Sequence, residues 1–70
     1  MTLTEAKSLN YGDMVYSKHY KNADGTPQRF RINGKVHTWK RNSNRVKVPI
    51  RRGLWENGYL TEENIERFYI

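Results

Sequence analysis

The sequence predicts a small, mostly β protein with five short strands and a helical turn before the last strand. Apolar and polar side chains alternate between residues 29 and 52, as they do along a strand with one buried face. Residues 14–20 are rich in residue types that favour strands. Turn-forming residues separate these segments into short pieces.

The length and composition of the chain limit how it can be stabilised. A chain of 70 residues is expected to form one domain over residues 11–70, preceded by a lead-in over residues 1–10. There is no cysteine, and two histidines cannot form a structural zinc site alone, so we expect no disulfide, metal or cofactor. No apolar run is long enough to cross a membrane or to act as a secretory signal, and we expect a cytoplasmic protein.

The net charge of +6 is concentrated in one segment. Residues 29–52 contain nine Lys or Arg side chains and no acid, whereas residues 1–28 are balanced and residues 53–70 carry a net charge of −3. In a folded, alternating segment such a block predicts a basic surface, which attracts phosphate backbones, anionic membranes or acidic proteins.

The first half of the chain is predicted as a helical turn, a strand and a loop. Residues 4–7 favour one helical turn with Thr4 as its N-cap, docked by Leu3 and Leu9. The first strand covers residues 14–20. A hydrophilic loop follows over residues 21–27, where Asp24-Gly25 favours a turn and Pro27 disfavours a central strand position.

Asn33-Gly34 is ordinarily a hairpin signal, but the flanking side chains argue against a two-residue hairpin. That register would place Ile32 opposite Lys35 and bring a lysine onto the apolar face. Either a wider loop pairing Ile32 with Val36, or one long strand that bends at an inward-facing Gly34, restores the alternation. We favour the bent strand.

The second half begins with a predicted turn at residues 42–44 and a strand over residues 45–51. Pro49 indicates that this strand is at an edge or that its pairing is interrupted there. Residues 53–58 are predicted as a loop, with Trp55 covering one end of the core or an interaction groove.

At the carboxyl end, Thr61 is an expected N-cap for a single helical or 3₁₀ turn. A short last strand then contains Phe68 and Ile70. The alternative is a longer helix over residues 62–68, because Ile65 and Phe68 are three residues apart.

Two short motifs are similar to those of SH3-like small β-barrels. Tyr11-Gly12-Asp13-Met14-Val15 resembles the Gly-Asp-x-Val opening of many such barrels, including KOW and Tudor-type modules. Residues 58–65 resemble the Gly–aromatic–apolar–turn–Asn–apolar ending of SH3 domains. The resemblance covers residues 11–70 and implies a five-stranded barrel. The chain also resembles small basic proteins of phages and mobile elements.

The same resemblance argues against the binding of proline-rich peptides. Asp24 is the single acid of the first long loop, and no adjacent pair of tryptophans opens a middle strand. Both features differ from SH3 domains that bind proline-rich peptides.

The leading functional hypothesis is weak, largely sequence-independent binding of DNA or RNA by the basic face. Arg and Lys side chains two residues apart on a strand lie about 6.5–7 Å apart, close to the repeat of phosphates along a strand. Trp39 and His37 could stack on bases. The alternatives are a face that is merely solvated and a Trp39 that packs on its neighbours. The candidate nucleic-acid-binding residues are Arg29, Arg31, Lys35, His37, Trp39, Arg41, Arg45, Lys47 and Arg51.

A second hypothesis is a protein-interaction module that binds a peptide or an acidic protein surface through an aromatic groove. Its candidate residues are Tyr16, Tyr20, Trp55 and Tyr59. Membrane-surface binding ranks third, because the sequence has no amphipathic helix or lipid anchor. Catalysis is not expected, because there is no nucleophilic cysteine, phosphate-binding loop or catalytic pair of acids.

Overall fold

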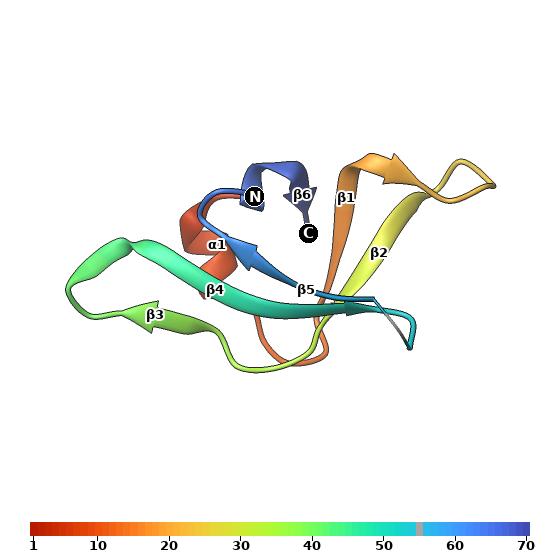
Figure 1. Ribbon diagram of the computed structural model, residues 1–70. Coiled ribbons are helices and arrows are strands. Elements are labelled where there is room, and N and C mark those ends of the chain that lie inside the picture. Colours follow the sequence, from red (N-terminus) through yellow and green to blue (C-terminus); the bar gives the residue numbers. More distant parts are fainter. Residues whose placement is uncertain (55) are drawn as a thin grey trace.

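The computed structural model describes residues 1–54 and 56–70, and it is mostly β (Figure 1). The described residues form one open antiparallel sheet of six strands and one short α-helix. The elements are α1 (Leu3–Lys7), β1 (Met14–Lys21), β2 (Pro27–Ile32), β3 (His37–Trp39), β4 (Asn42–Arg52), β5 (Glu56–Thr61), the 3₁₀ turn η1 (Ile65–Arg67) and β6 (Phe68–Tyr69). Within these ranges, no helix is long and apolar enough to cross a membrane.

The longest strand, β4, is the centre of the sheet. One of its edges pairs with β5 over residues 47–52, and the other edge pairs with both β3 and β2. Strand β1 pairs with β2, and the short β6 pairs with β1. The chain therefore makes a meander through β5 and returns through η1 to the first strand.

The segment around Asn33-Gly34 is neither a hairpin nor a wider loop. Strands β2 and β3 lie one after the other along the same edge of β4, as the bent-strand interpretation expected, but the strand is interrupted over residues 33–36 rather than continuous through a bend. The break lies beside Pro49, whose carbonyl oxygen accepts a hydrogen bond from the Asn33 N–H at 2.8 Å. Pro49 has no N–H to donate to the neighbouring chain, which explains why regular pairing along this edge of β4 stops between β2 and β3.

Gly34 is required by close contact rather than by a turn. A Cβ atom on this residue would lie 2.7 Å from Cγ of Pro49, so any side chain would overlap the proline ring. We expected Gly34 to face inward at the bend. In the structure, a side chain on residue 34 would instead meet the ring of Pro49.

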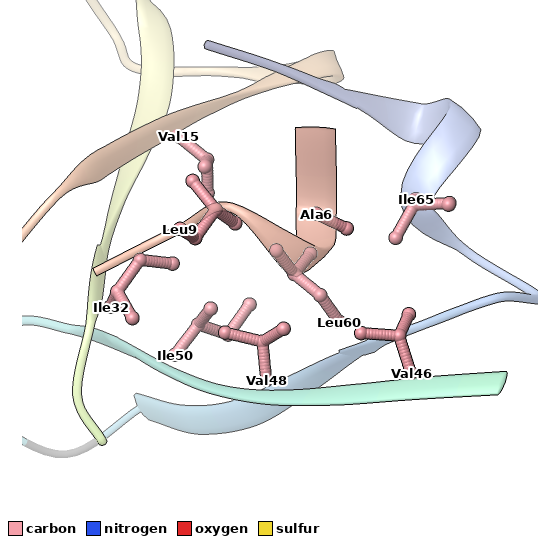
Figure 2. Packing of buried hydrophobic residues seen from close by; sticks show 9 residues of the cluster. All are labelled: Ala6, Leu9, Val15, Ile32, Val46, Val48, Ile50, Leu60 and Ile65. Carbon is pink, nitrogen blue, oxygen red and sulfur yellow. The ribbon is translucent and has the colours of Figure 1, made fainter. Parts of the chain in front are cut away.

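The core lies between the sheet and the segments α1 and η1, which pack on the same face (Figure 2). Phe30 and Val36 pack against this core, whereas Arg31 and Lys47 are exposed, so the predicted alternation is confirmed. Thr38 lies opposite the buried Val46, on the core side of the sheet, but it is exposed. The buried apolar residues are Ala6, Leu9, Val15, Ile32, Val46, Val48, Ile50, Leu60 and Ile65.

The N-terminal segment is fastened to the sheet at both of its ends. The helix α1 begins after Thr2, not after the predicted Thr4, because Thr2 and Glu5 form a reciprocal capping box. The Thr2 N–H and hydroxyl hold the pKa of the Glu5 carboxyl below its ordinary value. The amino group of Met1 donates to the Phe68 carbonyl at 2.8 Å, and Leu9 is buried, as expected.

Two predicted loops are shorter than the sequence suggested. The turn between β3 and β4 falls at residues 40–41, because Asn42 pairs with Trp39 and β4 extends to the end of the hairpin. Likewise, β5 begins at Glu56, and Gly58 pairs with Ile50 inside the sheet. Tertiary pairing thus overrides the turn preference of these residues. Trp55 lies outside the described residues.

The carboxyl end forms a 3₁₀ turn and not the longer helix, but the turn begins at Ile65 after the N-cap Asn64, not after the predicted Thr61. Phe68 already has the extended backbone of β6, which ends the turn after Arg67. Asn64 steadies the preceding turn, since its side-chain oxygen accepts a hydrogen bond from the Thr61 N–H at 2.8 Å. The predicted placement of Ile70 in the last strand is wrong, because Ile70 follows β6 and is 60% exposed.

The contact between Gly34 and Pro49 gives a stability prediction. Gly34→Ala is expected to lower the free energy of unfolding by about 1–3 kcal/mol, because the new methyl group would overlap a rigid ring. The control is Gly58→Ala, whose Cβ would meet its nearest neighbour, Cγ1 of Ile50, at 3.9 Å. The control should be neutral or up to about 1 kcal/mol more stable. Chemical denaturation measures the free energy of unfolding of both variants. Equal losses of stability would contradict the steric contact between residue 34 and Pro49.

Candidate functional site

The face of the sheet opposite the core carries most of the predicted binding residues. Residues directly opposite each other on paired strands share a face, and the pairs Tyr16–Arg29, Arg31–Arg51 and Lys47–His37 all lie on this side. We call it the outer face. Its members are Met14, Tyr16, Arg29, Arg31, His37, Trp39, Arg45, Lys47, Pro49, Arg51, Asn57, Tyr59, Thr61 and Tyr69. Five of them carry a positive charge, and none is a carboxylate.

Arg29 and Arg31 are the most available cations of the outer face. Both are exposed on β2, two residues apart, and neither forms an ion pair or a side-chain hydrogen bond with another described residue. Three more exposed cations follow the same line toward the tip of the β3–β4 hairpin: Lys35 between β2 and β3, and Lys40 and Arg41 in the turn. Their side chains are likewise unpaired among the described residues.

Three of the four cations on β4 lie on the outer face, and all three have internal partners; the fourth, Arg52, pairs with Glu56. Nε of Arg45 lies 3.4 Å from Oε1 of Glu62. The Lys47 ammonium lies 4.3 Å from the centre of the Tyr59 ring, a cation–π distance. These contacts orient the basic side chains and cover part of the aromatic surface.

Arg51 has a local structural role. Its Nε and Nη2 donate to the carbonyl oxygens of Gly53 and Leu54, at 3.0 and 2.8 Å. It therefore fixes the start of the β4–β5 connection, and two of its five donors are already used.

Trp39 is packed within the protein. It is half-buried, the Arg45 guanidinium lies 4.0 Å from the centre of its ring, and His37 meets it edge-on at 4.5 Å. These contacts favour the packing role for Trp39 over stacking on a ligand.

The tyrosines of the second hypothesis are spread over the sheet. Tyr16 lies on β1, and Tyr59 lies on β5, three strands away, or about 14 Å. Tyr20 follows a distortion of β1 at which the Ser17 hydroxyl accepts the N–H groups of His19 and Tyr20. The described tyrosines of this set therefore do not line one groove; Trp55, the fourth candidate, lies outside the described residues.

Sequence reasoning missed one aromatic neighbour. Tyr69 on β6 stacks on Tyr16, with ring centres 5.5 Å apart and planes inclined by 27°. The pairing of β6 with β1 brings them together across more than fifty residues of chain, and no local pattern signals that pairing.

Two grooves open at the edges of this surface. One, of about 430 Å³, lies between Met14, Arg31 and Arg51 on the sheet and Tyr11 and Leu54 in the loops. The other, of about 400 Å³, is lined by Tyr16, Arg29 and the β1–β2 turn. Since Arg29 and Arg31 are neighbours on one strand, they link the two grooves.

Acidic groups near the site are structural. Asp24 organises the β1–β2 turn, and its hydrogen bonds from the hydroxyl and N–H of Thr26 lower the pKa of its carboxyl. In the described part of the chain, no group of three His, Cys, Asp or Glu side chains is placed to hold a metal ion.

Comparison with known proteins gave no match to any family, curated protein or solved structure. Function is therefore argued from this surface alone.

Glu62 holds the basic end of β4 to the turn after β5. Its own N–H, then the Val46 N–H at 3.2 Å, and then the Arg45 guanidinium lower the pKa of its carboxyl. A lowered pKa means that this carboxylate stabilises the fold above the ordinary value of 4.5, and that the stabilisation is lost as the pH falls through the lowered pKa.

Glu62→Gln is therefore expected to reduce the loss of stability on acidification. Thermal or chemical unfolding from about pH 7 to about pH 3 measures this. Glu63→Gln is the control for charge: it changes the adjacent residue, whose carboxylate accepts no hydrogen bond from a described residue. If both variants had the same pH profile as the wild type, Glu62 would not make this contribution.

Proposed function

We propose that the protein binds DNA or RNA through the outer face of β2, β3 and β4, weakly and with little sequence preference. The observation that carries the proposal is the exposed Arg29–Arg31 pair on a sheet face whose described strand residues include no carboxylate; the Glu62 carboxylate that contacts Arg45 comes from the turn after β5. A face that served solubility alone would carry charges of both signs, as surfaces of soluble proteins ordinarily do.

The geometry fits a phosphate backbone. Arg29 and Arg31 project from one strand about 6.5–7 Å apart, close to the repeat of phosphates along a nucleic-acid strand. Lys35, Lys40 and Arg41 extend this row along the edge of β4. Contacts with phosphates release counterions, so the affinity is largely independent of sequence and falls with salt.

The SH3-like assignment is part of the same proposal. The strands follow one another as neighbours, a 3₁₀ turn precedes the last strand, and that strand returns to pair with the first. If β2 and β3 are counted as one interrupted strand, five strands remain, as the resemblance implies. The break at Gly34 would then be the bend of the long strand.

The peptide-binding alternative draws less support, because its described tyrosines are spread over β1 and β5. It remains an outcome of the test: a protein that bound acidic peptides but no oligonucleotide would favour it.

Arg31→Gln is expected to weaken binding and reduce its salt dependence. In a plot of log affinity against log salt, the slope should become shallower by about 0.9 for a duplex and about 0.7 for a single strand, for one lost phosphate contact. Fluorescence anisotropy with labelled oligonucleotides, between about 50 and about 200 mM salt, gives the slope.

Arg67→Gln is the matched control. It removes the same charge from an exposed arginine on η1, which packs on the core side of the sheet, and it should leave the slope unchanged. If both variants changed the salt slope equally, the binding would depend on net charge and not on the outer face. Absence of wild-type binding at about 50 mM salt would refute the proposed function.

A further inference from the structure

The groove beside Arg31 combines an apolar surface with a cationic one. Its loop side exposes large apolar side chains, since Tyr11 and Leu54 are each 73% exposed. Its floor on the sheet contains Met14, and Arg31 and Arg51 lie opposite each other on paired strands. Among the described residues that line it, none is acidic.

The two arginines of the groove have different roles. Arg51 is held by the carbonyl oxygens of Gly53 and Leu54, so it positions the apolar wall. Arg31 has no such partner among the described residues, and its guanidinium is free to bind an anion at the mouth of the groove. A fixed apolar wall next to a free cation suits a ligand with a flat ring and a negative charge.

Asn33 adds a polar edge to the same groove. Its backbone N–H is used by the Pro49 carbonyl, but its exposed side-chain amide forms no hydrogen bond with a described residue. An amide offers both donors and an acceptor, which match the edge of a nucleobase.

From these features we propose that the groove holds one unpaired base of a single-stranded nucleic acid, with the adjacent phosphate on Arg31. The inference rests on the proposed function and deepens it. The base lies against Tyr11 and Leu54, and the backbone continues from Arg31 to Arg29 along β2. The groove volume of about 430 Å³ falls within the usual range of small-ligand sites, roughly 300–1,000 Å³.

The groove discriminates between single and double strands. A base in a duplex is paired and stacked, so entering the groove requires flipping it out of the helix. An unpaired base needs no flipping and gains stacking on an aromatic ring. The protein therefore binds single strands more tightly than duplexes, while the outer face alone accounts for duplex binding.

The Met14 methyl group reports on this groove and also on a second hollow beside α1, which Glu5 and Leu9 line, so its shift is read together with the Tyr11 variants. The chain has two methionines: Met14 lines the groove, and Met1 packs against the core on the other face. With ¹³C-labelled methionine methyls, a single strand of about 12 nucleotides, within the range of known single-strand sites, should shift the Met14 signal and leave Met1 unchanged. The same strand annealed to its complement should leave both signals in place, and Met14→Leu assigns them.

Substitution of Tyr11 tests the stacking contact by affinity. Because Tyr11 is exposed, Tyr11→Ala is expected to fold, to lose about ten-fold in single-strand affinity and to keep its duplex affinity. Tyr11→Phe keeps the ring and should bind single strands like the wild type.

The outcomes separate the two proposals. The protein could bind single strands and duplexes with the same salt dependence, without a Met14 shift and without an effect of Tyr11→Ala. That result would refute base binding in the groove and leave the proposed function in place. A wild type that binds neither strand would overturn both. A Met14 shift by an acidic peptide in place of the single strand would assign the groove to a protein partner and refute the inference.

Discussion

The structure depends on the alternation of side chains along β4. Val46, Val48 and Ile50 are buried, and each contributes about 1.5–3 kcal/mol by leaving water. The intervening Arg45, Lys47 and Arg51 necessarily point to the opposite face. Since β4 pairs along both edges, its register fixes the face of every neighbouring strand, and a shift of one residue would bury its cations.

The basic segment therefore serves two purposes. On β4 the cations are anchored: Arg45 to Glu62 and Trp39, Lys47 to Tyr59, and Arg51 to the carbonyl groups of the following turn. On β2, Arg29 and Arg31 have no ion-pair or hydrogen-bond partner for their side chains among the described residues. Part of the positive charge of this small domain orders the loops and hairpins around its thin core. The remaining positive charge is available to a ligand.

Gly34 and Pro49 connect these two purposes. Their contact lies where pairing along one edge of β4 is interrupted between β2 and β3, while Pro49 remains paired with Tyr59 of β5 on the other edge. The interruption keeps both strands on the same edge, so the free cations of β2 lie in line with those of the hairpin turn. The Asn33 side chain is also left at the groove, because its backbone N–H is taken by Pro49.

Much of the fold could be predicted because it follows from local patterns. The alternation identified which face of β2 and β4 is buried. A turn before the last strand was predicted correctly, but its N-cap is Asn64 and not the predicted Thr61. The predicted turn at residues 42–44 and loop at residues 53–58 were partly wrong for a common reason. The local preference of these residues for a turn stabilises less than pairing with a long neighbouring strand does. A short segment of sequence does not reveal such pairing.

From the sequence alone, the two-residue period of strand geometry was enough to place the apolar side chains of residues 29–52 on one face and most of the cations on the other. Long-range contacts settle which of those cations lack a partner among the described residues, which aromatic rings stack, and that Tyr11 and Leu54 meet Arg31 in one groove. These contacts join residues far apart in the chain, and they depend on which strands pair and in which register.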